Sequence, residues 1–281
     1  INPVIDSKSE PNNCHPLTVN FKANPTGNHG TATFRWDFGD GATSASPDPA
    51  HTYYNYNSAP TTYNAQLTLT DKYNFCSVTK PVPVTVQPYI RANFAVERVT
   101  GCSPFSVLVT NNSTGGITSW QWDKDGDGAF DSTDPANWTF SKTNSGGSPL
   151  PTTIRLRVQN SGGCINEYSQ TITVNPTPTA NVNVNASGDL TCSPLDVNLA
   201  ATNVTNANTF EWHLIDGANT NIISTQQSTT YQLQNNDAFA HTYNIRFKAL
   251  NQYGCEYLSS PFPVTVQPFV DAQFSVTPTG N

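Results

Sequence analysis

This 281-residue sequence lacks the features of a nucleic-acid-binding or membrane-inserted protein. It has no methionine and only 13 lysines and arginines against 20 acidic residues, so its net charge is −7. A nucleic-acid site needs clustered cations that neutralise phosphates, so no nucleic-acid partner is expected. No apolar run approaches the ~20 residues that span a bilayer, so we expect no membrane insertion in this segment.

Apolar content and helical patterning are also low. Apolar residues make up 36 % of the chain, which disfavours one large core and favours several thin ones. No ten-residue stretch of strong helix formers occurs at helical spacing. Asparagine, threonine, serine and proline are abundant, so strands and turns are predicted instead of helices.

The six cysteines are regularly spaced. They form three pairs separated by 62, 62 and 63 residues, and this regularity predicts one disulfide per repeat: Cys14–Cys76, Cys102–Cys164 and Cys192–Cys255. No CxxC pair is present, which argues against a zinc site. Because disulfides persist in oxidising compartments, we expect an extracellular or cell-surface location.

An internal repeat becomes visible when the cysteines are aligned. Each unit runs from a Cys-x-Pro opening through an alternating strand to a tryptophan, and then through a second alternating strand to the later cysteine. The tryptophans are Trp36, Trp122 and Trp212. Alternation with period two is typical of strands buried on one face, and a central tryptophan is typical of a sandwich core. We therefore predict an all-β chain of tandem immunoglobulin-like β-sandwiches with the tryptophans in their cores.

The repeats follow one another with almost no linker. A proline ends each closing strand, and a new alternating segment starts within a few residues. The predicted domains are residues 1–88, 89–176 and 177–268, with the start of a fourth repeat at 269–281. Proline fixes its own φ and keeps the preceding residue extended, so we expect a stiff, linear array. No signal-peptide pattern occurs at Ile1, so we expect an internal segment of a longer protein.

The first repeat carries the motif of a known family. Trp36-Asp-Phe-Gly-Asp-Gly41, followed by His51-Thr-Tyr53 and Leu67-Thr-Leu-Thr-Asp71, resembles the signature of the polycystic-kidney-disease (PKD) domain. The second repeat matches in part, at Trp122-Asp-Lys-Asp-Gly-Asp-Gly128, and the third only in its framework. With their Cys-x-Pro openings, the repeats resemble PKD arrays in long cell-surface proteins of Bacteroidota, such as gliding-motility adhesins.

This resemblance implies an immunoglobulin-like fold and a stalk or adhesive role. The expected function is that of a rod-like extracellular segment of a large adhesin or filament, acting as spacer and adhesive surface, with gliding motility as an implied context. Its expected partners are other repeats of the same chain and surface polysaccharide or protein ligands. The alternative is a carbohydrate- or protein-binding accessory region of a secreted hydrolase, which a catalytic domain in the flanking sequence would reveal.

No catalytic residues are predicted. The five histidines occupy different places in different repeats, and none lies in an HExxH motif or beside a GxSxG turn. The run His51-Thr-Tyr-Tyr-Asn-Tyr56 is rich in aromatic residues. Its tyrosines either fill the edge of the first sandwich or form a surface that binds sugars or proteins.

The second repeat contains a candidate calcium site. Carboxylates occupy positions 1, 3, 5, 9 and 12 of a twelve-residue loop, namely Asp123, Asp125, Asp127, Asp131 and Asp134. Gly128 at position 6 permits a sharp turn, and the carbonyl of Ala129 falls at position 7. This is the spacing of the EF-hand loop, with Asp replacing the final Glu and without flanking helices. Crowded carboxylates repel one another unless a cation neutralises them, so we predict bound Ca²⁺. The alternative is an Asp/Gly-rich hairpin turn.

Overall fold

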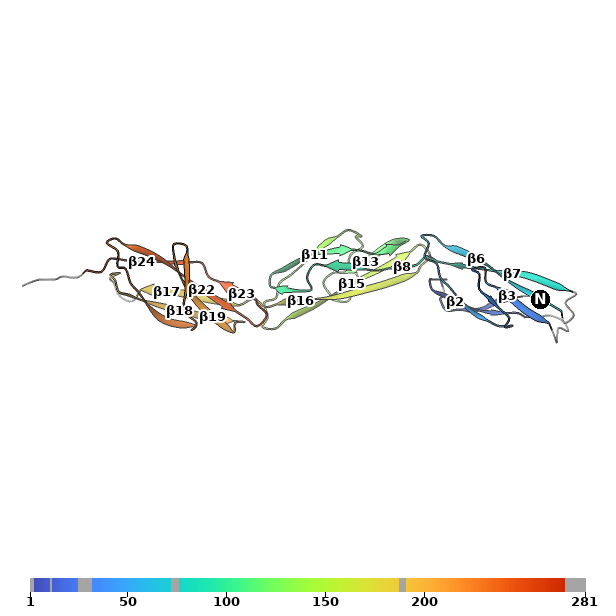
Figure 1. The fold of residues 1–281 in the computed structure, drawn as a ribbon, viewed down its shortest axis with the longest axis horizontal. Coiled ribbons are helices and arrows are strands. Elements are labelled where there is room, and N and C mark those ends of the chain that lie inside the picture. The colour runs from blue at the N-terminus through green and yellow to red at the C-terminus, as the bar shows by residue number, and fades with distance from the viewer. Residues whose placement is uncertain (1–2, 11, 25–31, 72–75, 187–190, 271–281) are drawn as a thin grey trace, which may run out of the picture. The chain divides into compact units, whose positions relative to one another are not determined.

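The computed structural model describes residues 3–10, 12–24, 32–71, 76–186 and 191–270. Their regular secondary structure is entirely β, which confirms the predicted all-β class. None of these residues belongs to a helix that could cross a membrane. Figure 1 labels many of these strands along the chain. The chain divides into two compact units. The first unit consists of Ile1–Glu97, Val107–Phe140 and Thr152–Thr171, and the second of Arg98–Ser106, Ser141–Pro151 and Ile172–Asn281.

The first repeat is a two-sheet sandwich within the first unit. One sheet has the strand order β1-β2-β5, with β1 (Val4–Lys8), β2 (Leu17–Lys22) and β5 (Ala50–Tyr53). The other has the order β4-β3-β6-β7, with β3 (Thr33–Asp37), β4 (Thr43–Ser44), β6 (Thr61–Thr70) and β7 (Ser77–Val86). Burial alternates along β2 and over much of β6 because successive side chains point to opposite faces.

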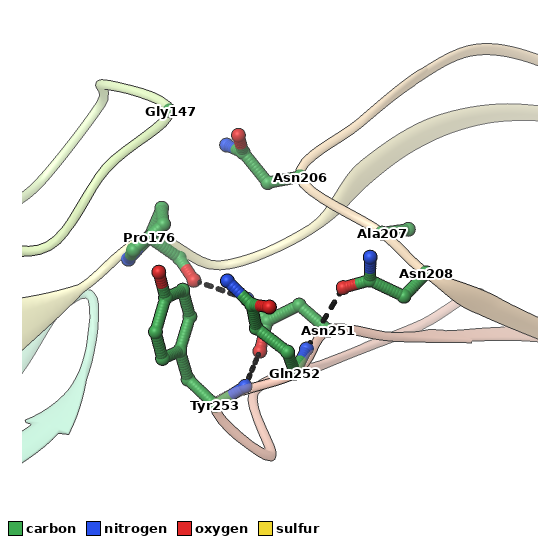
Figure 2. Close-up of a pocket in the computed structure, with 8 residues that line it drawn as sticks. All are labelled: Gly147, Pro176, Asn206, Ala207, Asn208, Asn251, Gln252 and Tyr253. Atoms are coloured by element: carbon green, nitrogen blue, oxygen red, sulfur yellow. Dashed lines mark hydrogen bonds between the residues drawn. The ribbon is translucent and has the colours of Figure 1, made fainter.

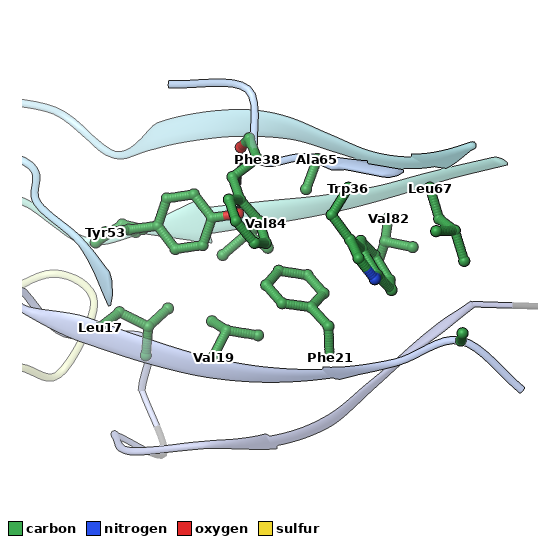
Figure 3. Close-up of a cluster of buried hydrophobic side chains, with 12 residues drawn as sticks. Leu17, Val19, Phe21, Trp36, Phe38, Tyr53, Ala65, Leu67, Val82 and Val84 are labelled. Carbon is green, nitrogen blue, oxygen red and sulfur yellow. Dashed lines mark hydrogen bonds between the residues drawn. The ribbon is translucent and has the colours of Figure 1, made fainter. Parts of the chain in front are cut away.

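Aromatic and branched side chains fill the core between these sheets (Figure 3). Trp36 of β3 is fully buried, and its ring lies 4.9 Å from that of Phe21 on β2. Leu67 of β6 and Val84 of β7 enter the core from the same sheet as Trp36. Trp122 and Trp212 are also fully buried. The prediction that the aligned tryptophans anchor the cores is therefore confirmed.

The second repeat contributes strands to both units. It contains β8 (Ile90–Arg91), β9 (Phe94–Val96), β10 (Thr100–Cys102), β11 (Phe105–Asn111), β12 (Thr114–Gly115), β13 (Ile117–Asp123), β14 (Trp138–Lys142), β15 (Leu150–Asn160) and β16 (Ile165–Asn175). Their sheets have the orders β10-β16-β15-β13, β14-β11-β9 and β12-β8. β13 pairs antiparallel with β15 and so holds Trp122 opposite Leu156.

The third repeat lies within the second unit. Its strands are β17 (Thr179–Ala186), β18 (Leu195–Thr205), β19 (Thr209–Asp216), β20 (Asn219–Ser224), β21 (Ser228–Leu233), β22 (His241–Leu250), β23 (Glu256–Leu258) and β24 (Phe262–Val266). One sheet has the order β17-β18-β21; the other has the order β20-β19-β22-β23, with β24 also on β22. Trp212 and Phe247 lie in the core, with ring centroids 4.9 Å apart. The domain boundaries at residues 88, 176 and 268 stay a prediction.

Candidate functional site

The Cys-x-Pro opening of a repeat lies at the carboxyl end of its closing strand. In the second repeat, Cys102 pairs in parallel with Asn175 at the end of β16. The backbone N–H of Ser103 donates to the Asn175 carbonyl at 2.9 Å. In the third repeat, Cys192 forms the equivalent parallel bridge with Gln267. Two segments far apart in the sequence are thus joined at one end of the sandwich.

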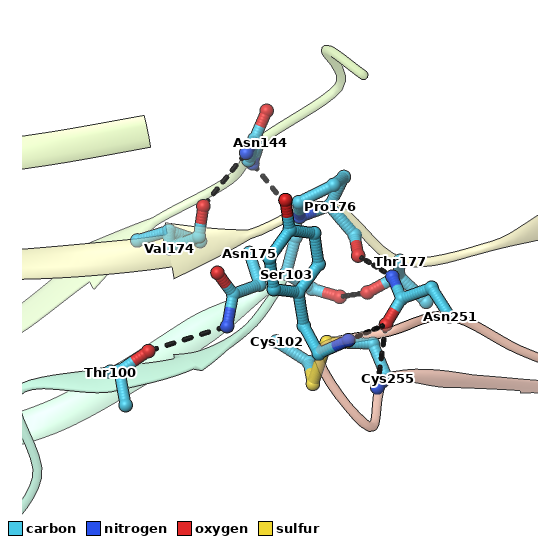
Figure 4. The surroundings of a disulfide bond; sticks show 11 residues. Thr100, Cys102, Ser103, Asn144, Val174, Asn175, Pro176, Thr177, Asn251 and Cys255 are labelled. Carbon is cyan, nitrogen blue, oxygen red and sulfur yellow. Dashed lines mark hydrogen bonds between the residues drawn. A yellow bond between two sulfur atoms is a disulfide. The ribbon is translucent and has the colours of Figure 1, made fainter. Parts of the chain in front are cut away.

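A buried asparagine fixes this opening. Asn144 donates its backbone N–H to the Ser103 hydroxyl at 2.8 Å and its side-chain amide to the Val174 carbonyl at 2.7 Å (Figure 4). The equivalent bonds join Asn55 to His15 and Val86, and Asn235 to Ser193 and Val266. These asparagines belong to none of the motifs recognised in the sequence. Their signal was a constant position, 20 or 21 residues before the later cysteine of each repeat.

The later cysteine lies in a hairpin beyond the two long strands. Asn160 accepts the N–H of Cys164 on its Oδ1 at 3.0 Å, and Asn251 accepts the N–H of Cys255 at the same distance. In the first repeat an aspartate takes this place, since Asp71 Oδ1 accepts the N–H of Cys76 at 3.0 Å. A short polar side chain therefore shapes each cysteine hairpin.

The predicted disulfides Cys14–Cys76, Cys102–Cys164 and Cys192–Cys255 are wrong. The structure instead joins Cys14 to Cys164 and Cys102 to Cys255, with Cα–Cα distances of 5.6 and 5.5 Å. Cys76 and Cys192 are free and exposed. Each bond links the opening cysteine of one repeat to the hairpin cysteine of the next.

Strand length explains this correction. β16 runs for 11 residues from the Cys164 hairpin to the end where Cys102 lies. At about 3.3 Å per residue these two cysteines lie some 30–35 Å apart along the strand, whereas a disulfide needs a Cα–Cα distance of about 4.4–6.8 Å. β6 and β22, with ten residues each, separate the cysteines of the first and third repeats in the same way.

At the first joint, where the first and second repeats meet, two contacts involve residues next to the Cys14–Cys164 bond in the sequence. The side-chain amide of Asn12 donates to the Gly163 carbonyl at 3.3 Å. Gly162 packs so closely on Gln87 that an added Cβ would lie 2.3 Å from the Gln87 side chain. A larger residue at position 162 would therefore have to displace the Gln87 side chain.

At the second joint, side chains bridge the two repeats beside the Cys102–Cys255 bond. Asn251 donates its amide to the Pro176 carbonyl at 2.7 Å, and Asn206 donates to the Gly146 carbonyl at 3.2 Å. Thr177 donates its hydroxyl to the Ser103 carbonyl. Figure 2 shows the small polar pocket that Pro176, Asn206 and Asn251 line together with Tyr253 and neighbouring residues.

The acidic loop of the second repeat brings three of its five aspartates together. Ligand oxygens of Asp123, Asp125 and Asp127 lie within 4.8 Å of one another. This convergence of carboxylate oxygens fits a hard cation such as Ca²⁺. Asp131 and Asp134 are not in this group; their backbone groups hydrogen-bond to Trp122 instead.

A positively charged side chain, that of Arg155, also lies at this loop. Asp123 is buried, and its Oδ2 accepts Nε of Arg155 at 3.0 Å and the N–H of Gly128 at 3.1 Å. Its Oδ1 accepts the N–H of Gly126 at 2.8 Å. The N–H of Ala129 donates to Asp127 at 2.7 Å. Arg155 therefore neutralises part of the negative charge for which a Ca²⁺ ion is predicted, and calcium binding stays a prediction.

The tyrosine-rich run divides between core and surface. Tyr53 is fully buried, whereas Tyr54 and Tyr56 are 53 % and 74 % exposed. The exposed rings surround His15 together with Tyr89, and the His15 centroid lies 4.7 Å from that of Tyr56 and 5.0 Å from that of Tyr89. Burial lowers the pKa of His15 below its ordinary value. The prediction that the run fills the sandwich edge therefore holds for Tyr53, while binding of sugars or proteins by the exposed Tyr54 and Tyr56 stays a prediction.

A comparison with known protein families finds a match for the first repeat. Residues 1–86 match the model of the PKD domain. This segment contains the Trp36–Gly41 motif, so the first repeat is similar to a PKD domain. None of the curated proteins matches the chain.

Several solved structures resemble the chain at low identity. The three N-terminal domains of the highly immunogenic outer capsid protein of bacteriophage RB49 share 11 % identity over 91 % of this chain and 94 % of that chain, with a TM-score of 0.39. The eight N-terminal immunoglobulin domains of the Down syndrome cell adhesion molecule share 11 % identity over 96 % of this chain and 42 % of that chain, with a TM-score of 0.41. A structure from a 1.5-MDa bacterial ice-binding adhesin shares 12 % identity over 96 % of this chain and 98 % of that chain, with a TM-score of 0.31. At these values the similarities say nothing about a ligand or partner of this chain.

Proposed function

We propose that this chain is a segment of an extracellular repeat array that acts as a stiff spacer in a large cell-surface adhesin. The observation that carries the proposal is the disulfide between successive repeats at each joint. A proline joint alone leaves one backbone connection about which two sandwiches can swivel. A second covalent connection removes most of that freedom, and such bonds persist in oxidising surroundings.

The same proposal includes a setting and ligands. The PKD-type first repeat and the Cys-x-Pro openings favour a surface protein of the Bacteroidota type, with gliding motility as its context. A spacer needs no catalytic group, so we propose a non-enzymatic role. The partners we propose are neighbouring repeats and surface polysaccharides or proteins.

Double electron–electron resonance tests the stiffness. Spin labels at two exposed sites, one in each of two adjacent repeats, should give a narrow distance distribution in the oxidised chain. The paired change Cys14→Ser and Cys164→Ser should broaden the distribution across the first joint only. The change Cys102→Ser and Cys255→Ser should do so across the second joint only. A broad distribution in the oxidised chain, or no change on removing the bonds, would refute the spacer role.

A second role, sugar binding by an accessory region of a secreted hydrolase, is favoured by the exposed tyrosines around His15. Aromatic faces such as those of Tyr54 and Tyr56 are suited to stacking against sugar rings. Binding to a panel of polysaccharides should fall on Tyr54→Ala and Tyr56→Ala. Phe239→Ala, which removes an exposed aromatic ring from the third repeat, is the matched control. Equal binding by all these variants would exclude this surface.

We also propose that Ca²⁺ binds the Asp123 loop. The convergence of the three carboxylates supports it, with Asp123, Asp125 and Asp127 as the side chains that would hold the ion. The ion would neutralise the loop together with Arg155 and stiffen it against the second sandwich.

A further inference from the structure

The two disulfides have the same pattern of pairing, and two cysteines are not bonded. The opening cysteine of a repeat bonds to the hairpin cysteine of the next repeat, as in Cys14–Cys164 and Cys102–Cys255. Cys192 is an opening cysteine and Cys76 is a hairpin cysteine, and both are free and exposed. Each is therefore of the type that the other would need as its partner.

The surroundings of Cys192 match those of a bonded opening cysteine. Ser193 donates its N–H to the Gln267 carbonyl at 3.1 Å, as Ser103 does to Asn175 at 2.9 Å. The backbone N–H of Asn235 donates to the Ser193 hydroxyl at 2.8 Å, the distance found between Asn144 and Ser103. The backbone that presents Cys102 to a hairpin of the next repeat is thus already formed at Cys192.

The hairpin at Cys76 matches in the same way. The N–H of Asp71 donates to the Cys76 carbonyl at 2.9 Å, and the corresponding bond at Cys164 comes from Asn160 at 3.1 Å. The Asp71 carboxylate accepts the N–H of Cys76 at 3.0 Å, as the Asn160 side chain does for Cys164. The residue pairs that bracket the bonded hairpin and the free one, Asn160–Cys164 and Asp71–Cys76, therefore make the same two hydrogen bonds.

We infer that Cys192 and Cys76 are the two halves of a further joint, each forming a disulfide with the complementary cysteine of another repeat of this kind. The inference deepens the proposed function by naming the partner: for Cys192, a cysteine hairpin like those of Cys164 and Cys255. A second copy of this chain offers such a hairpin at Cys76. Bond formation oxidises the two thiols and reduces one low-molecular-weight disulfide, such as oxidised glutathione, to two thiols.

The test uses the whole chain in a glutathione redox buffer. The unmodified chain should form a ladder of disulfide-linked oligomers, and non-reducing peptide mapping should find Cys76 joined to Cys192 of another copy. Cys76→Ser and Cys192→Ser should each lose the ladder when alone, and an equal mixture of the two should stop at a dimer. Cys76–Cys76 or Cys192–Cys192 bonds as the main products, or dimers of the single variants as abundant as in the mixture, would overturn the inference.

A fusion of two copies of this chain in one polypeptide provides a second test, because it fixes the sequence separation between Cys192 of the first copy and Cys76 of the second. When residue 4 of a second copy follows Pro268 of the first, Cys192 stands 76 residues before the fusion point and the second Cys76 stands 73 residues after it. The resulting separation of 149 residues matches the native values of 150 and 153. We expect this bond to form along with the native ones. If both thiols still react with a thiol reagent while the native bonds are intact, the inference fails and the spacer proposal stands.

Discussion

Asn251 donates its side-chain amide to the carbonyl of Pro176 at 2.7 Å. Its Oδ1 also accepts the N–H groups of Tyr253 and Cys255, each at 3.0 Å. One buried side chain therefore shapes the cysteine hairpin of the third repeat and ties it to the last residue of the second. Asn160 makes the equivalent hairpin bonds at the first joint. Its Nδ2, however, is buried without a hydrogen-bond partner among the described residues.

This difference predicts unequal effects of the same substitution. Asn251→Asp keeps the acceptor that shapes the hairpin, as Asp71 does in the first repeat, but loses the bond to Pro176. We expect it to lower the unfolding free energy of the third repeat by about 1–3 kcal/mol, the typical cost of disrupting a buried hydrogen bond. Asn160→Asp loses no such bond and should cost less. Calorimetry of both variants is the measurement, and equal destabilisation would contradict the role given to Asn251.

Removing the joint disulfides should lower stability without abolishing the sandwiches. The variant Cys14→Ser with Cys164→Ser opens a loop of 150 residues, for which the chain-entropy model gives an upper limit of about 5 kcal/mol. Trp36 and its core neighbours do not depend on this bond. We therefore expect lower melting temperatures with unchanged far-ultraviolet circular dichroism. The variant Cys76→Ser with Cys192→Ser is the matched control and should melt like the unmodified chain.

The first joint should be weakened by mild acid because of His15. Its Nδ1 accepts the N–H of Asn55 at 2.9 Å, which requires the neutral ring. Burial lowers the pKa of His15 in the folded chain, so the unfolded chain binds the proton first as pH falls. The stability contributed by the neutral ring is therefore complete above about pH 6.5 and is lost between that pH and the lower folded pKa.

His15→Ser is the variant that checks this prediction. Ser103 and Ser193 occupy the same place in the other repeats and accept the equivalent bond through their hydroxyl groups. The serine variant should keep the opening intact and lose the decline in melting temperature between pH 7 and pH 5. A decline of the same size in the variant would show that another group titrates.

The sequence predicted the sandwich cores well because their signals are local. Alternation in β2 and β22 and the three aligned tryptophans depend only on which residues face inward. The disulfide partners were mispredicted because pairing depends on which end of the sandwich each cysteine occupies. The nearly constant spacing from Cys14 to Cys76, found again in the other repeats, shows only that the repeats are alike, whereas the ten residues of β6 place the two cysteines far apart.

The polar contacts of the buried asparagines could not be predicted from the sequence motifs either. Asn55, Asn144 and Asn235 bond to groups about 30 to 40 residues away in the sequence. A single chain rich in asparagine gives no reason to single them out. Alignment of the three repeats on their later cysteines shows the constant position of these asparagines, but only the structure shows the groups to which they bond.

The acidic loop gives the last prediction. Asp123, Asp125 and Asp127 lie close enough for shared ligation, while Asp131 and Asp134 contribute backbone groups to the turn around Trp122. If Ca²⁺ binds with a dissociation constant of about 1 mM, typical of extracellular modules, then 10 mM Ca²⁺ adds about 1.4 kcal/mol to the stability of the folded state. We expect a corresponding rise in the melting temperature of the full chain, and no rise with sodium at matched ionic strength.

Two pairs of variants locate the ligands. Asp125→Asn with Asp127→Asn should abolish the calcium-dependent rise, because it removes two of the three converging carboxylates. Asp131→Asn with Asp134→Asn should reduce the rise much less, since these side chains are outside that group. Asp123 is left unchanged because its carboxylate is buried against Arg155, and its loss would destabilise the loop without any ion. A rise of equal size in the Asp125/Asp127 pair, or none in the unmodified chain at 10 mM Ca²⁺, would leave Arg155 as the main cation of this loop and end the calcium hypothesis.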